Sequence, residues 1–136
     1  MSRLPGVFAL LLVTFMLRAG PGFDPVKDVP ISVSNGVLTL SVPKGVHLKA
    51  RLLRVTLASP GSLRLGALPP PSGQDEAGDP IWRGTVKVRL NSSGLEDPAR
   101  LMIIYQPCTE GPDGQCFLPV KRRLAVPVAD IPAEAP

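Results

Sequence analysis

Residues 31–42 read ISVSNGVLTLSV, and this stretch predicts a β-hairpin. Apolar and polar side chains alternate on both sides of Asn35-Gly36, a dipeptide typical of tight two-residue turns. The alternation places Leu38, Leu40 and Val42 on one face of an extended chain. The stretch therefore predicts two short strands, the second of which turns one face toward a core.

The rest of the chain repeats this pattern of short strands separated by turn residues. Further strands are expected over residues 46–57 with a break near Ala50, and over residues 62–68, 85–90, 100–105 and 117–128. Residues 69–80 and 91–98 are rich in Pro, Gly, Ser and acidic residues and predict connections. The expected inward positions in the later strands are Val86, Val88, Leu90, Leu124, Val126 and Val128.

The character of these strands and the lack of predicted helices indicate the fold class. Residues 101–104 are apolar on both faces, which is typical of a central strand. No segment predicts a convincing helix, and the 17 prolines disfavour long helices. The sequence therefore predicts an all-β protein, an immunoglobulin-like antiparallel β-sandwich.

The amino terminus predicts export. Arg3 precedes residues 4–17, an uncharged and mostly apolar run that is shorter than the roughly 20 residues needed to cross a bilayer. We expect residues 1–22 to be a signal peptide; the alternatives are a membrane anchor through residues 4–17 and a buried amino-terminal element. Residues 23–128 would form one domain and residues 129–136 a flexible tail. An exported domain, periplasmic or otherwise extracytoplasmic, resides where a disulfide persists.

Composition and charge exclude several functions. The 136-residue chain has a formal net charge of +4, and its basic residues are scattered apart from residues 121–123. That basic run lacks interleaved aromatic residues, so we interpret it as a solvated strand end and expect no nucleic-acid partner. No Ser/His/Asp set, phosphate-binding loop or spaced carboxylate pair indicates hydrolytic chemistry.

The two cysteines lie in one short segment, residues 105–119, which read YQPCTEGPDGQCFLP. The run from Gly111 to Gly114 has strong turn chemistry and reverses the chain between Cys108 and Cys116. The sulfurs therefore come within reach of each other, as a structural crosslink or as a redox pair. A crosslink of this length stabilises a domain by about 2.6 kcal/mol in the loop-entropy estimate. Both interpretations remain open from these residues.

Other candidate residues have competing interpretations. Two thiolates with His47 or Met102 would suit a soft ion such as Cu(I), but a lone His and a lone Met are more often structural. We expect no metal and no other cofactor, and a half-exposed His47 at a strand edge. Asp75 and Glu76 either tune and shield the cysteines from a loop or belong to a solvated turn.

The cysteine segment resembles the active-site hairpin of the amino-terminal periplasmic domain of the DsbD thiol:disulfide interchange family. That family shows a strand ending in Tyr-Gln-x-Cys, a turn, a second Cys, and then an aromatic residue and a Pro. The matching positions here are Tyr105, Gln106, Cys108, Cys116, Phe117 and Pro119. Two upstream segments resemble further family features in the same order: VPKGVHL at residues 42–48, and Asp75-Glu76 followed by IWR at residues 81–83.

The resemblance, which covers residues 33–128, implies an immunoglobulin-like domain that relays reducing equivalents as a thiol:disulfide oxidoreductase. It implies that Cys116 forms the intermolecular bond, that Cys108 resolves it, and that the surrounding residues line or tune the site: Tyr105, Gln106, Phe117, Asp75 and Glu76. The implied acceptors are periplasmic thioredoxin-like proteins that serve disulfide isomerisation or cytochrome c maturation. The alternative is a non-catalytic immunoglobulin-like binding domain with a structural disulfide.

Three features depart from the family pattern. The segment between the cysteines is longer than the family's usual turn, and Ala77 stands where the loop over the site normally carries an aromatic residue. The membrane domain and the thioredoxin-like domain of the full-length family proteins have no counterpart in the sequence. The expected electron donor is therefore a separate transmembrane thiol reductase.

Overall fold

The computed structural model describes residues 22–133. The predicted signal peptide or anchor and the last three residues of the predicted tail lie outside the described residues, apart from Gly22. Within residues 22–133 there are eleven β-strands and two short 3-10 helices, and all strand pairs are antiparallel except for one isolated bridge. In this part of the chain no helix is long and apolar enough to cross a membrane.

The first sheet contains the β-hairpin that the sequence predicts over residues 31–42. Its strand order is β1 (Ile31–Ser34), β2 (Val37–Ser41), β8 (Thr85–Ser93) and β5 (Ser62–Leu65). Asn35 and Gly36 have φ angles of 52° and 76°, as a two-residue turn with both central residues left-handed requires. Leu38 and Leu40 are fully buried, which confirms the face predicted from alternation.

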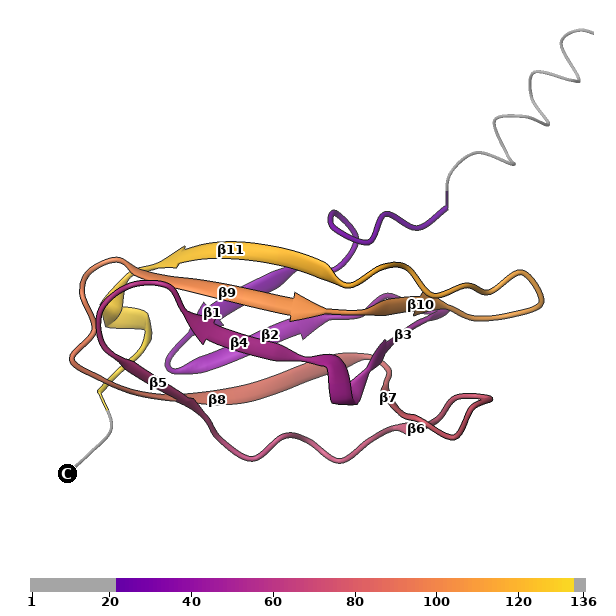
Figure 1. The fold of residues 1–136 in the computed structure, drawn as a ribbon, viewed down its shortest axis with the longest axis horizontal. Helices are drawn as coiled ribbons and strands as arrows, with labels where there is room; N and C mark the ends of the chain where they lie inside the picture. The colour runs from indigo at the N-terminus through magenta and orange to yellow at the C-terminus, as the bar shows by residue number, and fades with distance from the viewer. Residues whose placement is uncertain (1–21, 134–136) are drawn as a thin grey trace, which may run out of the picture.

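The second sheet faces the first across the core. Its order is β11 (Val120–Val126), β9 (Ala99–Tyr105) and β4 (Arg54–Leu57), so β9 is central as predicted. Figure 1 shows the two sheets as the layers of a sandwich. The core between them consists of buried side chains from both layers, among them Leu38, Leu40, Val86, Val88, Leu90, Leu101, Ile103 and Tyr105. These observations confirm the predicted all-β, immunoglobulin-like sandwich.

A third sheet, made of four short strands, lies at one end of the sandwich and joins its layers. Its order is β10 (Pro107–Thr109), β3 (Val46–Lys49), β7 (Pro80–Trp82) and β6 (Gly73–Gln74). Strand β3 continues into β4 through the 3-10 turn η1 (Ala50–Leu52), β9 continues into β10, and β7 continues into β8 (Figure 1). This end sheet therefore draws its strands from both layers; it contains Cys108 in β10, and Cys116 lies opposite Cys108 in an isolated bridge.

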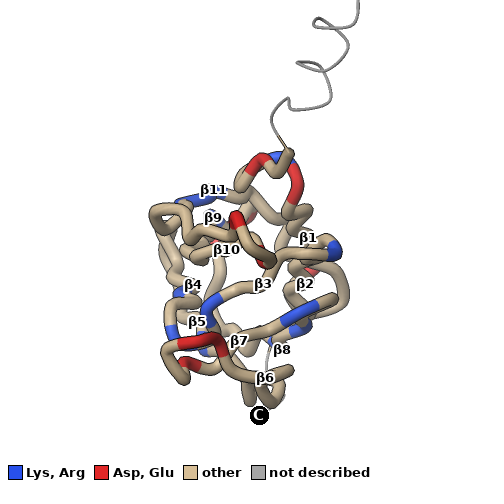
Figure 2. Tube along the Cα trace, turned by 90° about the vertical axis from the view of Figure 1, so that its right-hand side faces the viewer, with Lys and Arg blue, Asp and Glu red and all other residues tan. Residues whose placement is uncertain are grey.

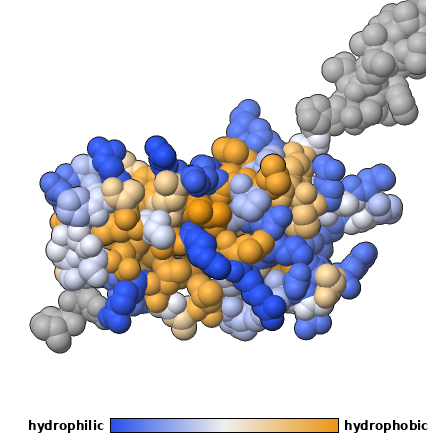
Figure 3. All heavy atoms as spheres, in the orientation of Figure 1, coloured by the Kyte–Doolittle hydropathy of each residue, from blue (hydrophilic) through white to orange (hydrophobic). Residues whose placement is uncertain are grey.

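The open side of the sandwich lies between two edge strands. β4 and β5 are the outer strands of their sheets and contact each other. Their inward side chains Val55, Leu57, Leu63 and Leu65 are partly buried against the core. Figure 3 shows apolar atoms across the middle of the face that Figure 1 presents, with hydrophilic atoms toward both ends. The two strands thus close the core on this side only in part.

Several predicted boundaries were wrong: β5 ends at Leu65, β11 begins only at Val120, and the connection predicted over residues 69–80 contains β6 and the first residue of β7. Strand β8 extends through residues 91–93, which the sequence assigns to a connection, because these residues pair with β5. Val128 is not in the last strand but begins the 3-10 turn η2 (Val128–Asp130). Residues 129–133 are not loose: Ile131 is only 1% exposed, and Gly36 N donates to Asp130 O at 2.8 Å. The packed domain therefore extends beyond residue 128.

Candidate functional site at the disulfide hairpin

Cys108 and Cys116 form a disulfide across the hairpin that follows β9. Cys108 lies in β10, and the two residues are opposite each other as an antiparallel bridge. Backbone bonds hold the hairpin on both sides of the disulfide: Thr109 N donates to Gln115 O at 2.9 Å, and Phe117 N donates to Pro107 O at 3.0 Å. The predicted chain reversal between the cysteines is confirmed, and its geometry does not depend on the sulfur bond alone.

Glycine allows the turn to close tightly. Gly111 has a φ of +99°, a conformation that side chains disfavour, and its carbonyl accepts from Gly114 N at 2.9 Å. A Cβ on Gly114 would lie 2.4 Å from Thr109 O, so no side chain fits there without movement of the backbone. In the Gly-Pro-Asp-Gly run, Gly111 therefore adopts a φ angle that other residues disfavour, and Gly114 fits where a side chain would overlap the backbone.

The two cysteines differ in their accessibility. Cys108 is 2% exposed, whereas Cys116 is an exposed residue. Thiol–disulfide exchange requires a thiolate to reach one sulfur in line with the bond. Of the two cysteines, Cys116 is thus the one open to solvent, and Cys108 is the one enclosed by the fold.

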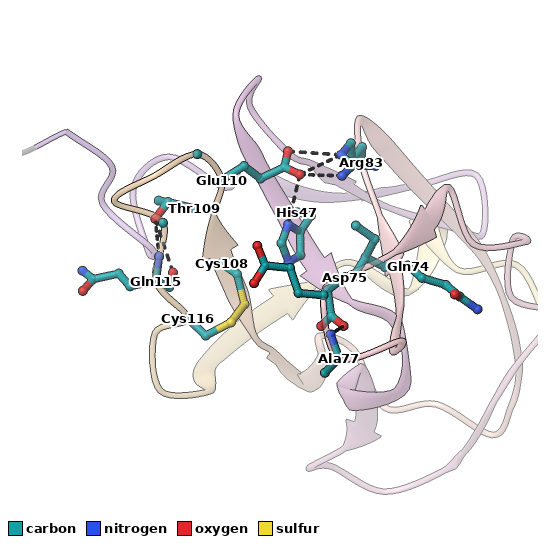
Figure 4. A pocket seen from close by; sticks show the side chains of 14 residues that line it. His47, Gln74, Asp75, Ala77, Arg83, Cys108, Thr109, Glu110, Gln115 and Cys116 are labelled. Atoms are coloured by element: carbon teal, nitrogen blue, oxygen red, sulfur yellow. Dashed lines mark hydrogen bonds and ion pairs between the residues drawn. A yellow bond between two sulfur atoms is a disulfide. The ribbon is translucent and has the colours of Figure 1, made fainter.

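A cavity of about 450 Å³ lies beside the disulfide. Its walls come from β3, from the cysteine hairpin and from the loop between β6 and β7, and Figure 4 shows their side chains converging on the sulfur atoms. Both cysteines, His47, Asp75 and Glu76 are among the residues that line it. Figure 2 looks onto this end of the molecule and shows acidic segments on the β6–β7 loop.

An ion pair holds the β6–β7 loop. Lys49 Nζ on β3 pairs with Asp75 and lies 3.4 Å from an oxygen of Asp79. The other oxygen of Asp75 accepts from Ala77 N at 3.0 Å and Asp79 N at 2.9 Å, which closes the turn of the loop. The hydrogen bond from Lys49 and those within the turn hold the pKa of Asp75 below its ordinary value. Asp75 therefore fixes both the shape of the loop and its position over β3.

A second charged group holds the hairpin to the end of β7. Arg83 Nε lies 2.9 Å and Nη2 2.5 Å from one oxygen of Glu110, and Nε also lies 3.1 Å from the other oxygen. His47 Nδ1 lies 3.4 Å from Glu110. The hydrogen bonds from Arg83, aided by the charge of His47, lower the pKa of Glu110 against the opposing effect of burial. The carboxylate is therefore ionised at neutral pH beside the disulfide.

Cys116 also borders a second cavity, of about 410 Å³, on the side of η1. Lys49, Arg51 and Gln106 are among its lining residues. Gln106 Nε2 donates to Phe117 O at 2.8 Å and so positions the chain directly after Cys116. The exposed cysteine thus lies between an acidic loop and a basic turn.

Two predicted site residues line neither cavity at the disulfide. Tyr105 is buried in the core, and its hydroxyl donates to Pro25 O at 2.7 Å and accepts from Arg122 at 3.3 Å. Burial raises the pKa of Tyr105. The ring of Phe117 packs on Phe23, with 5.6 Å between the centroids. Both side chains therefore contact the amino-terminal segment and not the disulfide.

Sequence reasoning misplaced His47, and it missed both Lys49 and the pairing of Arg83 with Glu110. The prediction of a half-exposed His47 at a strand edge was wrong: the residue is 8% exposed and β3 is an inner strand of its sheet. The motif match at residues 42–48 was the one signal that pointed to it. Among residues 22–133 no group of three His, Cys, Asp or Glu side chains is arranged to hold a metal ion.

Comparisons with known proteins identify the fold. No family model matches the chain, and no curated protein matches it. The solved structures that match include the reduced DsbD N-terminal domain of Neisseria meningitidis, with a TM-score of 0.55 and 17% sequence identity. The match covers 77% of this chain and 89% of that one. The resemblance inferred from the residues is thus confirmed for the immunoglobulin-like fold.

Proposed function

We propose that this chain is an exported thiol:disulfide oxidoreductase domain that relays reducing equivalents through Cys108 and Cys116. One observation carries the proposal: the disulfide joins an exposed Cys116, which borders two cavities, to a Cys108 that is 2% exposed beside ionised side chains. A purely structural crosslink needs neither the cavities nor the asymmetry. The similarity in fold to the DsbD N-terminal domain supports the same assignment.

The relay consists of two exchanges. A thiolate of the donor attacks the Cys116 sulfur, the disulfide breaks, and Cys108 leaves with the electron pair as a thiolate. A second donor thiolate releases the mixed disulfide, so the donor is oxidised and the domain gains two electrons and two protons. Cys116 then attacks an acceptor disulfide, and Cys108 resolves that second mixed disulfide.

The proposed partners follow from this chemistry and from the resemblance. The donor is a separate transmembrane thiol reductase, and the acceptors are periplasmic thioredoxin-like proteins, including those of cytochrome c maturation. The leader predicted over residues 1–22 would deliver the domain to that compartment. Asp75, Glu76 and Gln106 line the path to the sulfurs, and in this proposal they tune the exchange.

The reduction potential tests the proposal against the structural alternative. A relay disulfide has a potential above about −300 mV, the upper limit typical of structural disulfides in exported proteins. A Cys108→Ser variant should also accumulate a mixed disulfide with a thioredoxin-like protein through Cys116. A potential below that limit, together with no mixed disulfide, would establish the non-catalytic binding domain instead.

Unfolding of the reduced protein provides a second test. By thermodynamic linkage, a disulfide that is readily reduced in the folded protein stabilises the fold little. A simple crosslink of this loop contributes about 2.6 kcal/mol. The backbone hydrogen bonds of Thr109 and Phe117 hold the hairpin independently of the disulfide. We therefore expect the reduced domain to stay folded and to lose less than about 2.6 kcal/mol of unfolding free energy. Urea unfolding of the oxidised and reduced forms measures the difference.

A further inference from the structure

His47 is buried without a hydrogen-bond partner. Among the described residues, the buried side-chain nitrogen and oxygen atoms that lack a hydrogen bond are the two ring nitrogens of His47. A buried polar group without a partner costs folding free energy, so such a group in a native protein calls for an explanation. The side chain is 10% exposed and lines the cavity beside the disulfide. The residue that carries this cost in folding free energy therefore lies at the proposed reactive centre.

Strand register places this imidazole next to the buried cysteine. His47 on β3 and Cys108 on β10 are direct partners in the antiparallel pairing. Directly opposed residues of antiparallel strands project to the same side of the sheet, with Cβ atoms about 4.5–5.5 Å apart. Figure 4 shows the ring of His47 on the side of the disulfide, with one nitrogen turned toward Glu110. The other nitrogen, Nε2, has no hydrogen-bond partner, and Cys108 is the residue directly across the strand pair from His47.

The charged groups around His47 come from every wall of the cavity. Glu110 on the hairpin lies 3.4 Å from Nδ1 and is itself held by Arg83 at the end of β7. Asp75 and Glu76 face the cavity from the β6–β7 loop, and Lys49 on β3 pairs with Asp75. Glu110 is thus the charge in direct reach of the ring, and Arg83 fixes its position.

We propose that His47 donates a proton to Cys108 when the disulfide opens and accepts it back when the disulfide forms, with Glu110 positioning the ring. The inference rests on the proposed thiol–disulfide exchange. It follows from the juxtaposition of a buried imidazole, whose ring nitrogens have no hydrogen bond, with the buried cysteine of the disulfide. Histidine suits this role because it changes protonation near neutral pH.

In the proposed step one bond between sulfur atoms forms, another breaks, and one proton moves. An external thiolate forms a bond to the Cys116 sulfur while the Cys116–Cys108 bond breaks. The electron pair goes to the Cys108 sulfur, which takes the proton from the His47 imidazolium and becomes a neutral thiol. In the reverse direction neutral His47 removes that proton, and the Cys108 thiolate attacks the mixed disulfide and expels the external thiolate. Without the proton transfer a thiolate would be left in a buried position, at a cost in desolvation.

The test is the rate at which dithiothreitol reduces the oxidised full-length protein between pH 5.5 and 9, expressed per concentration of dithiothreitol thiolate. In the parent protein this rate should fall as pH rises, because the imidazolium disappears. His47→Gln should be about tenfold slower at pH 6 and should lose the pH dependence. Glu110→Gln, which removes the carboxylate that positions the ring, should show a weaker pH dependence than the parent. Glu96→Gln makes the same chemical change at an exposed residue outside both cavities and should match the parent.

Superimposed pH profiles for the parent, His47→Gln and Glu110→Gln would refute the role of His47. If His47→Gln does not fold, the size of the pH dependence in Glu110→Gln decides the matter, because that side chain is partly exposed and its loss leaves the core intact. A relay that fails for other reasons gives a different result. The parent would then form no mixed disulfide with thioredoxin-like proteins, yet its reduction by dithiothreitol would still report on His47.

Discussion

Lys49 on β3 forms an ion pair with Asp75 on the β6–β7 loop, and this contact holds the loop over the cavity beside the disulfide. The two residues are far apart in sequence and meet because β3 pairs with β7, the strand that follows the loop. Asp75 has a second task, since its other oxygen accepts the backbone bonds that close the turn. The position of the loop and its internal shape therefore depend on one carboxylate, and substitutions can separate the two contributions.

Asp75→Ala should loosen the loop more than Asp75→Asn does. Alanine removes the ion pair and the acceptor for Ala77 N and Asp79 N, whereas asparagine keeps an oxygen for the turn and removes only the charge. Hydrogen exchange of these two amides should be faster in Asp75→Ala and nearly unchanged in Asp75→Asn. Both variants should speed reduction of the disulfide. Equal exchange in parent and Asp75→Ala would show that the loop is held by other contacts.

Acid should destabilise the domain through the same site. The pKa values of Asp75 and Glu110 lie below their ordinary 3.8 and 4.5 in the folded state, chiefly because Lys49 and Arg83 donate hydrogen bonds to them. A lowered folded-state pKa means a stabilising contribution that is full above the unfolded value and is lost as pH falls through the folded value. The melting temperature of the oxidised protein should therefore drop as pH falls below about 4.5.

The combined variant Asp75→Asn with Glu110→Gln checks this assignment. It should melt at a lower temperature than the parent at pH 7 but should lose less on acidification, because two of the titrating groups are gone. If the melting temperature of the variant falls with pH as steeply as that of the parent, other carboxylates cause the acid destabilisation. Asp24 is one such group, because backbone hydrogen bonds also lower its pKa.

Single-cysteine variants should differ in their reactivity. In Cys108→Ser the remaining Cys116 is exposed, whereas in Cys116→Ser the remaining Cys108 is buried in β10. Because alkylation requires an accessible thiolate, Cys116 should react with iodoacetamide about tenfold faster or more at pH 8. Mass spectrometry of quenched samples measures both rates. Equal rates would contradict the assignment of Cys116 as the attacking residue.

Gly114→Ala should distort the hairpin. The added Cβ would lie 2.4 Å from Thr109 O, and relief of such an overlap costs about 1–3 kcal/mol. Gly73→Ala is the matched control, because its Cβ meets only the end of the Arg83 side chain, at 3.4 Å. Urea unfolding should separate the two variants, and the amide resonances of Thr109 and Gln115 should move only in Gly114→Ala. Equal stability would show that the turn relaxes at no cost.

Local sequence information was sufficient for the strands and for the disulfide hairpin. Alternation with period two marks Leu38, Leu40, Val86, Val88 and Leu90 as inward-facing, because one face of each strand must leave water. Turn chemistry is equally local, since Asn35-Gly36 and Gly111 adopt left-handed φ angles that few other residues tolerate. For the same reason the proximity of Cys108 and Cys116 follows from the short segment between them.

The surroundings of the disulfide were decided only by the tertiary structure. The burial of His47 and its position opposite Cys108 depend on the register of β3 against β10, strands that are distant in sequence. The end of β7 brings Arg83 to Glu110, and the β6–β7 loop brings Asp75 to Lys49. No local sequence pattern predicts these contacts, because pairing between distant strands depends on how all the apolar faces pack into one core. The sequence by itself therefore determined that a disulfide closes in a β-sandwich, and the packing determined which charges and which imidazole surround it.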